Sequence, residues 1–520
     1  MIFFLLPSVN ICIYKCIDCI LVEEAPKPKI SNSLSCYLTE IKNKIKICDN
    51  DWDIYKKYTN PYEYINSVVP DVFNKSYNGQ KTEGLEQFEA ITTDSNSATR
   101  RVAALESPEG SFDSESASLI LASDIEFKSA PLRGAALNSP VPLSRLASFG
   151  QRSFASQQLN QENAKRHCEK DDFGEIGSLI KYNKHISRCV SKYKPLSRSY
   201  FKMIELLHNF IYTNNINMYR SFDNQIYNYN TPIQQDITPI RSFHLAEGPG
   251  GFIEALVNTR KNSEDIYVGM TIIDDENEQN IPGWKKSEQF LKNNKNVTIE
   301  LGEDGTGNVL SIQNFLYCRN KYGSSMDLIT ADGGFDFSMD FNSQEQNISK
   351  LLFAQICYAL CLQKIKGNFI LKIFDCFIEH TVDLLYILSA FYEKVYITKP
   401  QTSRYANSEK YIVCKNFLVI NDKGVFPYLK TSFEKMLHAS SIKPEINTYR
   451  FLKIPISTFF ITKIEEYNAI FGQQQIENIH QTITLIENKQ NNDKLEIIIK
   501  SNIQKCIHWC VKYKVAYNTF

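Results

Sequence analysis

An α/β fold is predicted for residues 170–426 of this chain, and three observations lead to it. Short runs rich in β-branched and aromatic residues alternate with longer runs in which apolar residues recur every three or four positions. A glycine-rich bend, Gly248 to Gly251, stands between the first such strand and a helical pattern. Turn-forming residues bound the strands. Alternation of this kind favours a largely parallel sheet with helices on both faces.

Residues 1–91 are expected to form an N-terminal extension of mixed, mainly helical structure. The first residues are apolar, but Pro7, Asn10, Lys15 and Asp18 interrupt them, and neither a basic leader region nor a small-residue cleavage site is evident. A packed extension is therefore favoured over a membrane span or a signal peptide. Helical spacing and aromatic residues follow, and they indicate a packing unit.

Residues 92–165 are predicted to be a disordered insert. From 92 to 157 serine and alanine dominate, tyrosine and cysteine are absent, and arginine replaces nearly all the lysine. Such a segment buries too little apolar surface to offset its ordering entropy. A functional linker, a foreign insertion and a gene-model artefact remain open as explanations of its origin.

The central region and the C-terminal extension follow. Strands are predicted at 242–247, 265–273, 296–302, 326–334, 367–375, 394–400 and 409–417, and helices at 250–260, 343–365 and 380–394. From 427 to 520 the pattern becomes mainly helical. A solvated face is favoured over a polyanion contact for its cations, which are Lys500, Lys505, His508, Lys512 and Lys514.

Charge and cysteine usage restrict the class of protein. Lysine plus arginine and aspartate plus glutamate each number 58, so any nucleic-acid surface must be local. The 14 cysteines form no regular framework, which indicates reduced thiols in an intracellular protein. Cys12, Cys16 and Cys19 lack the second half of a zinc motif, so unpaired thiols are favoured there and no metal is expected.

The glycine-rich bend is the first candidate site, because ligands of doubly wound sheets bind beyond the carboxyl ends of the strands. The bend lacks the G-x-G-x-x-G spacing of dinucleotide sites, and its acid would repel a diphosphate. An ammonium and a sulfonium suit it better, which points to S-adenosylmethionine. The predicted cofactor residues here are Glu247, Gly248, Pro249, Gly250, Gly251 and Phe252.

Charged residues also stand near the ends of other elements. Asp304 follows the third strand and is expected either to accept a hydrogen bond from adenine or to fix its loop. Asp332 ends the fourth strand, and Lys372 interrupts the apolar fifth, where an unpaired ammonium would be costly. Lys202 lies in a helix before the sheet, and Glu409 precedes the last strand. Taken together, these residues favour one shared site over separate structural roles.

Six motifs lie between about residues 180 and 420, a region that is roughly half of the chain: SRSYFK, FHLAEGPGGFIEAL, GEDGTGNV, ADGGFDFS, FILKIFD and KPQTSRYANSEKYIVC. In them the chain resembles the FtsJ-like, Adrift-type RNA ribose 2′-O-methyltransferases, especially the mRNA cap-1 enzymes of eukaryotes and large DNA viruses. The resemblance implies a Rossmann-like, seven-stranded methyltransferase sheet that uses S-adenosylmethionine. It also implies a catalytic tetrad of Lys202, Asp332, Lys372 and Glu409, with Asp304 and Asp332 beside the cofactor.

The implied reaction is an in-line displacement, in which a ribose 2′-oxygen attacks the cofactor methyl carbon. Lys372 is expected to be the general base or to orient the hydroxyl, with Asp332 orienting Lys372, Glu409 anchoring a lysine, and Lys202 positioning ribose or phosphate. Only RNA carries the acceptor hydroxyl. Residues 181–202 are basic and without a carboxylate, which favours an RNA phosphate track. Further substrate contacts are expected from Arg198, Arg404 and Asn407.

The favoured function is methylation of the first transcribed nucleotide of capped mRNA. A ribosomal- or transfer-RNA 2′-O-methyltransferase and a non-catalytic RNA-binding relative remain as alternatives, whereas a dehydrogenase is disfavoured by the missing dinucleotide spacing. RNA is the expected partner, with other capping or transcription machinery as further candidates and no membrane contact. The expected location is the nucleus or the cytoplasm, including a viral factory or virion.

Overall fold

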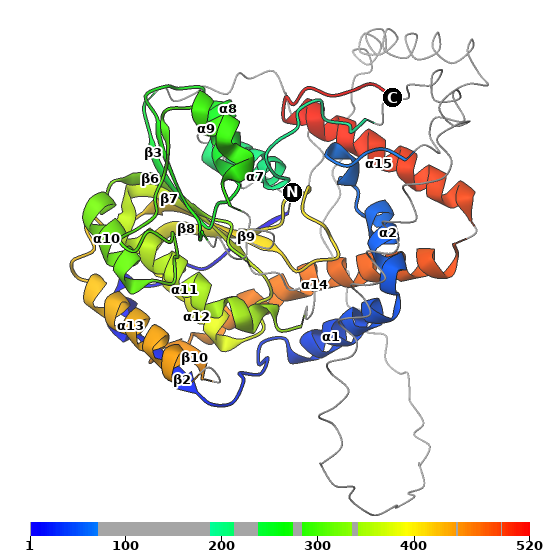
Figure 1. Cartoon of the computed structure of the whole chain (residues 1–520). Coiled ribbons are helices and arrows are strands. Elements are labelled where there is room, and N and C mark those ends of the chain that lie inside the picture. Colours follow the sequence, from blue (N-terminus) through cyan, green and yellow to red (C-terminus); the bar gives the residue numbers. More distant parts are fainter. Residues whose placement is uncertain are drawn as a thin grey trace, which may run out of the picture. The chain divides into compact units, whose positions relative to one another are not determined.

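The structure is a computed structural model that describes residues 2–70, 188–212, 238–273, 283–334, 342–443, 446–489 and 491–520 (Figure 1). The predicted insert at 92–165 lies outside the described residues. No helix within these ranges is long and apolar enough to cross a membrane. Nor do the described histidine, cysteine, aspartate and glutamate side chains form a group of three or more that could hold a metal ion.

The described strands form one large sheet and a separate pair. The large sheet has the order β1-β8-β9-β7-β6-β3-β4-β5, and β2 pairs with β10. The strands are β1 (Phe3–Leu5), β2 (Ile17–Val22), β3 (Arg241–Leu245), β4 (Ile266–Met270), β5 (Val297–Ile299), β6 (Met326–Ala331), β7 (Gln363–Ile373), β8 (Tyr392–Thr398), β9 (Lys410–Phe417) and β10 (Asn447–Leu452).

The seven predicted strands of the central region are present as β3 to β9, and the sheet is mostly parallel. β3 pairs in parallel with β4 and β6, β4 with β5, and β6 with β7, whereas β9 runs antiparallel between β7 and β8. After β5 the chain crosses to the other side of β3 to form β6. The order therefore reverses between β3 and β6, where ligands bind in folds of this class.

Helices cover both faces of the sheet, as predicted. Alternation along β7 directs Phe369 and Leu371 into one core and Ile370 into the other. The first core contains α10 (Ile312–Tyr322), α11 (Gln344–Leu362), α12 (Glu379–Phe391) and α13 (Phe426–Ile442). The second contains α7 (Ser199–Leu206), α8 (Gly251–Arg260) and α15 (Asn492–Lys512). Figure 1 shows α7 and α8 across the sheet from α10 to α13.

The two terminal extensions pack together. The N-terminal part contributes α1 (Asn32–Ile47) and α2 (Asp49–Thr59), and α1 lies against α14 (Thr458–Glu487) in a third apolar cluster. The apolar N-terminus has a structural use that sequence patterns did not reveal. Its strand β1 pairs antiparallel with β8 and adds an eighth strand at the sheet edge. A second difference concerns the helix predicted at 343–365, which ends at Leu362, where β7 begins.

Candidate active site

The glycine-rich bend follows β3 and turns the chain into α8. Gly250, the residue before the helix, has a φ of 103°, which favours glycine because it has no Cβ. A Cβ on Gly251 would overlap the hydroxyl oxygens of Ser197 and Ser199, which precede α7 and open it. The glycines therefore let the bend lie directly against the segment that leads to Lys202.

Glu247 lies in this bend and is buried, with 4% of its surface exposed. Its Oε1 accepts hydrogen bonds from the backbone N–H groups of Phe252 at 2.7 Å and Ile253 at 3.1 Å. Burial and the nearby charge of Asp332 raise the pKa of Glu247 to about 8. A cation bound beside these two carboxyl groups would favour the ionised form of Glu247.

Lys372 and Asp332 meet at the carboxyl ends of β7 and β6. The Lys372 ammonium donates to the Asp332 backbone carbonyl at 2.6 Å and lies 3.3 Å from its Oδ1. Lys372 also stands opposite Tyr411 in the antiparallel pairing of β7 with β9. The Tyr411 hydroxyl donates to Asp332 Oδ1 at 2.7 Å. The lysine predicted from its odd position in an apolar strand is thus held by an acid, at a site with 12% of its side chain exposed.

Lys202 and Glu409 form the second ion pair, with Nζ 2.8 Å from Oε2. Ser403 donates to the other carboxylate oxygen at 2.6 Å. Burial alone would raise the pKa of Glu409, but the charges of Lys202 and Lys372 outweigh it and lower that pKa to about 2. Glu409 is therefore ionised and within electrostatic reach of both lysines.

Tyr411 joins the two pairs and was missed by sequence reasoning. Its hydroxyl, which donates to Asp332, also lies 3.5 Å from Lys202 Nζ. The structure thus brings Lys202, Asp332, Lys372 and Glu409 together at one edge of the sheet. A tyrosine inside an apolar strand looks like a core residue. The signal was its place two residues after Glu409, on the same side of the strand.

Lys399 is a second residue that the sequence did not single out. Its buried ammonium donates to the carbonyl of Glu409 at 2.8 Å, and to the carbonyl and side-chain oxygens of Asn407 at 2.7 and 2.9 Å. Burial lowers the pKa of Lys399. Asn407, a predicted substrate contact, therefore uses its amide oxygen to shape the loop before β9.

The other two predicted substrate residues converge on an acid of the N-terminal extension. Glu63 has 2% of its surface exposed and lies 2.7 Å from Arg198 and 3.5 Å from Arg404. Arg198 also donates to the Thr402 carbonyl at 3.1 Å. One carboxylate thus holds the start of the helix that carries Lys202 and the loop that leads to Glu409. The Arg404 side chain is 44% exposed.

Asp304 organises the loop after β5. Its Oδ1 accepts hydrogen bonds from the backbone and hydroxyl of Thr306 and from Asn314, and its Oδ2 accepts one from Ser311. These bonds outweigh desolvation and lower the pKa of Asp304 to about 2. Of the two roles predicted for Asp304, the geometry supports the fixing of the loop, and contact with adenine stays a prediction.

A cavity of about 220 Å³ lies beside the loop that ends at Glu409. The terminal extensions supply half of its wall, and the loop supplies much of the remainder. Its polar and aromatic lining residues are Lys42, Trp52, Lys56, Asn60, Gln344, Phe374, Arg404, Tyr405, Asn407, Ser408, Gln475 and Asn478. The buried side-chain oxygen of Asn60 has no hydrogen-bond partner in the structure.

Residues 195–417 match the FtsJ-like methyltransferase family. These residues form an FtsJ-like methyltransferase domain. The domain contains every residue of the tetrad and the glycine-rich bend. Glu63, Lys42 and α15 lie outside it.

Two curated relatives illustrate what the domain is similar to. The chain is 31% identical over 192 residues to "Cap-specific mRNA (nucleoside-2′-O-)-methyltransferase 2" of Drosophila melanogaster, which covers 34% of this chain and 27% of that protein. It is 29% identical over 190 residues to "Cap-specific mRNA (nucleoside-2′-O-)-methyltransferase 1" of Trypanosoma brucei brucei. That match covers 36% of this chain and 50% of the trypanosome protein. The chain thus spans at most half the length of these relatives.

Among solved structures, a putative ribosomal RNA methyltransferase from Plasmodium falciparum shares 20% identity, with a TM-score of 0.28. That match covers 43% of this chain and 98% of the other. A TM-score this low carries no argument about the reaction.

Proposed function

We propose that this chain transfers a methyl group from S-adenosylmethionine to the ribose 2′-oxygen of the first transcribed nucleotide of capped mRNA. The observation that carries the proposal is the meeting of Lys202, Asp332, Lys372 and Glu409 beside the glycine-rich bend. The FtsJ-like domain supports the methyl transfer, and the names of the relatives support a capped substrate.

The bend fits the proposed cofactor. Glu247 and Asp332 place two carboxyl groups near each other, and burial together with the charge of Asp332 raises the pKa of Glu247. S-adenosylmethionine, when bound, supplies a methyl group on a positively charged sulfur. Glu247, Asp332 and the backbone of Gly250 and Gly251 would hold it, because acidic groups and a glycine-lined surface suit a cation that approaches the backbone closely.

The tetrad then acts on the acceptor hydroxyl. The 2′-oxygen forms a bond to the methyl carbon while the carbon–sulfur bond breaks, and the hydroxyl proton passes to Lys372 as the proposed general base. Asp332 fixes the Lys372 nitrogen through two contacts, so little reorganisation is needed at the moment of reaction. Lys202 adds positive charge for a ribose or phosphate oxygen, and Glu409 holds Lys202 in place.

The cavity beside the loop is the proposed place for the cap guanine nucleotide. Trp52 and Tyr405 line the cavity and offer aromatic surface on which a guanine base could stack. Arg404 is the most exposed cation at its rim and suits the cap phosphates. In this proposal the terminal extensions and the FtsJ-like domain share the recognition of the cap, because both line the cavity.

A substrate panel tests the proposal. The full chain is incubated with labelled S-adenosylmethionine and with capped RNA, the same RNA uncapped, ribosomal RNA and transfer RNA, and each methyl group is mapped by mass spectrometry. We expect transfer to the first nucleotide of the capped RNA only. Transfer to ribosomal or transfer RNA in preference would identify the alternative methyltransferase. Cofactor binding without transfer to any RNA would identify a non-catalytic relative. An intracellular location and contacts with other capping machinery also stay proposals.

A further inference from the structure

Two basic segments from distant parts of the sequence lie side by side next to α7. Residues 188–204 contain five lysines and arginines, and residues 497–520 contain four. Neither segment contains an aspartate or a glutamate, although acids and bases are equal in number over the whole chain. Positive charge is thus segregated here.

Backbone contacts hold the two segments together. Ser191 and Tyr517 form an antiparallel bridge, and the Lys192 N–H donates to the Ala516 carbonyl at 2.9 Å. Helix α15 is fixed against α7 by the edge-to-face contact of Phe201 and Trp509, whose ring centroids are 5.6 Å apart. The segments therefore form one surface of fixed geometry.

The cations of this surface are exposed and lack carboxylate partners among the described residues. We use the name "basic surface" for Arg188, Lys192, Lys194, Lys505, Lys512 and Lys514. Glu496, which directly precedes the second segment, forms an ion pair with Lys500 and not with these six cations. Glu205 follows the first segment and Glu254 contacts it, and these two acids are 0% and 5% exposed. Glu205 accepts bonds from the loop before Glu409, and Glu254 accepts bonds from Tyr193 and Leu196. Neither faces solvent, so neither neutralises the basic surface.

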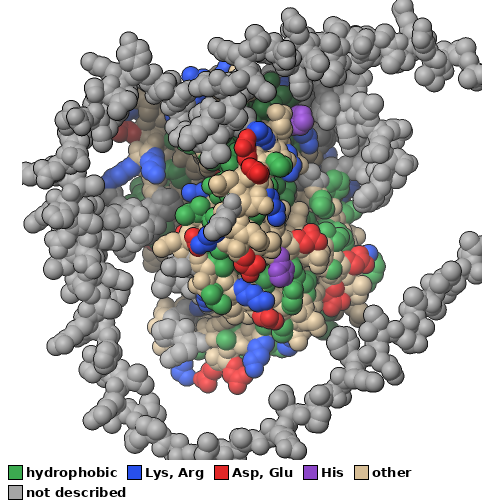
Figure 2. All heavy atoms as spheres, turned by 90° about the vertical axis from the view of Figure 1, so that its right-hand side faces the viewer, with side chains coloured by type: hydrophobic (Ala, Val, Ile, Leu, Met, Phe, Trp, Pro, Cys, Tyr) green, Lys and Arg blue, Asp and Glu red, His purple; other side chains and the backbone are tan. Residues whose placement is uncertain are grey.

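Elsewhere on the described surface, exposed lysines pair with carboxylates, as in Lys44–Glu40, Lys292–Glu288 and Lys443–Glu23. Figure 2 shows acidic and basic side chains mixed on the face that it draws. Like charges held together without counter-charges repel one another and destabilise the folded state. Binding of a polyanion to a surface with six such cations is favoured, because the counterions condensed on the polyanion are released into the solvent.

We propose that the basic surface binds phosphates of the RNA body that follows the capped end, an inference that rests on the proposed function. The segment that carries Lys192 and Lys194 continues directly into Arg198 and Lys202 at the active site. An RNA chain whose first ribose lies at Lys372 would therefore pass close to the basic surface. This proximity favours RNA over an acidic polypeptide as the ligand of the basic surface. The surface would increase the affinity for long substrates without taking part in methyl transfer.

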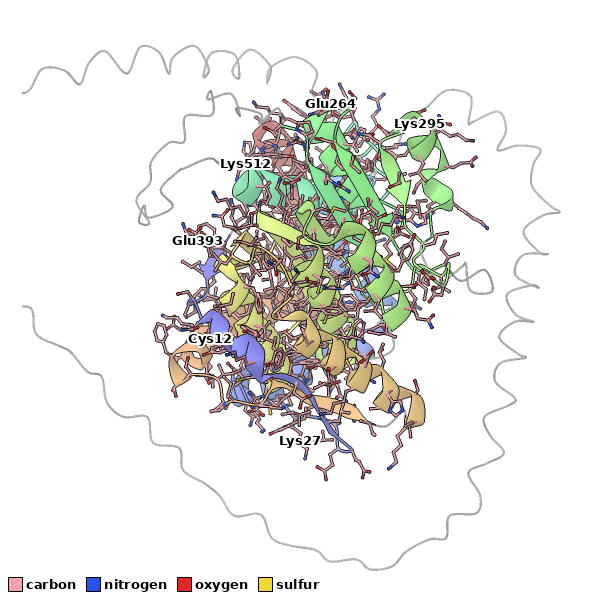
Figure 3. All side chains as sticks on the ribbon, turned by 90° about the vertical axis from the view of Figure 1, so that its left-hand side faces the viewer. Cys12, Lys27, Glu264, Lys295, Glu393 and Lys512 are labelled. Atoms are coloured by element: carbon pink, nitrogen blue, oxygen red, sulfur yellow. The ribbon has the colours of Figure 1, made fainter. Side chains whose placement is uncertain are left out.

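A charge-reversal variant tests this inference through binding, without turnover. The variant is Lys505→Glu, Lys512→Glu and Lys514→Glu in the full chain. Its control is Lys27→Glu, Lys295→Glu and Lys423→Glu, which makes the same charge change at exposed positions; Figure 3 shows Lys27 and Lys295 well away from Lys512. Fluorescence anisotropy measures the Kd of labelled, uncapped single-stranded RNA of about 20 nucleotides over a range of salt concentrations.

We expect the basic-surface variant to raise this Kd by about tenfold or more and to reduce the salt dependence by about two in log–log slope, since each lost phosphate contact removes roughly 0.7. The control should change the Kd by no more than about twofold and leave the log–log slope unchanged. In a methylation assay the KM values of long and short capped RNAs should converge in the basic-surface variant. Equal effects of the two variants, or an unchanged salt slope, would overturn the inference. Binding of polyglutamate by the wild-type chain, without binding of the RNA, would also overturn the inference. Because the anisotropy assay uses uncapped RNA and measures binding alone, its result stands apart from any failure of the proposed reaction.

Discussion

At the scale of single residues, one hydroxyl links both halves of the candidate active site. Tyr411 donates to Asp332, which holds Lys372, and its oxygen lies within 3.5 Å of Lys202. Hydrogen bonds to charged groups contribute more than those between neutral groups. Tyr411 therefore fixes the distance between an acid–lysine pair and the second lysine.

Replacement of Tyr411 by phenylalanine should lower kcat by about tenfold to a hundredfold, because a hydrogen bond to a charged group contributes about 1.5–3 kcal/mol. The lost hydrogen bond should also lower the free energy of unfolding by a similar amount, so the rates are compared at a temperature where both variants are folded. The matched control is Tyr392→Phe, which removes a buried strand hydroxyl bonded to Gln363. Single-turnover methylation of capped RNA measures the effect, and equal rates in both variants would contradict this role.

Glu247 gives the binding of S-adenosylmethionine a predicted pH dependence. Its pKa is raised to about 8 in the free protein, so Glu247 is mainly protonated below that pH. A bound cation favours the ionised form, so binding must release a proton there. The affinity should therefore rise by up to about tenfold per pH unit between pH 6 and 8 and level off above 8.

Titration calorimetry at several pH values measures this dependence. Glu247→Gln should remove it, whereas Glu264→Gln, at an exposed position labelled in Figure 3, should keep it. An affinity of the wild-type chain that is constant or falls with rising pH would show that Glu247 does not face the cation.

Sequence reasoning found the four tetrad residues because each breaks a local pattern or ends an element, and parallel strands bring such ends to one edge. It did not find Tyr411, Lys399 or Glu63. A buried tyrosine in a strand is ordinary, and the partners of a buried ion depend on contacts between distant segments. For Asp304 the sequence left two roles open, contact with adenine and fixing of the loop, because its hydrogen-bond partners cannot be read from the sequence.

At the scale of elements, the bend between β3 and α8 sets the site against the start of α7. Gly251 has no room for a methyl group, since Ser197 and Ser199 occupy that space. The bend and the helix that carries Lys202 are therefore interdependent. Strands β3 to β9 were predictable from their runs of β-branched and aromatic residues. Strand β1 was not, because a strand of three residues is defined only by its pairing with β8.

Substitution of Gly251 by alanine should reduce stability by about 1–3 kcal/mol through overpacking, and it should weaken cofactor binding by shifting the bend. Gly283→Ala is the control, since a Cβ there would meet nothing within 4 Å. Denaturant unfolding and calorimetry measure the two effects. A fully stable Gly251→Ala chain with normal affinity would mean that the bend and α7 are not in close contact.

At the scale of the whole molecule, the terminal extensions belong to the same compact unit as the FtsJ-like domain. Glu63 holds two arginines of the domain, and Lys42 of α1 forms a buried ion pair with Asp375 at 3.0 Å. The predicted division into extension and domain does not reveal these contacts, because composition says nothing about which distant segments meet. The chain also leaves and re-enters this unit at one point: the Val69 N–H donates to the Arg188 carbonyl at 3.1 Å.

Because those ends meet, the predicted insert at 92–165 should be replaceable by a linker of about eight glycine and serine residues. The shorter loop should stabilise the fold by about 1 kcal/mol or less, since the entropy cost of loop closure falls slowly with loop length. Thermal unfolding measures the stability of the shortened chain, and a methylation assay measures its activity. Loss of folding in the shortened chain would show that the removed residues contribute to the core, contrary to the composition of 92–157.

The most direct measurement is the mapping of methyl groups on capped RNA after incubation with the wild-type chain and with Lys372→Met. We predict 2′-O-methylation of the first nucleotide by the wild type, a loss of at least about a thousandfold in the variant from the missing base and its orientation, and an unchanged Kd for S-adenosylmethionine. Normal methylation by Lys372→Met would contradict the account.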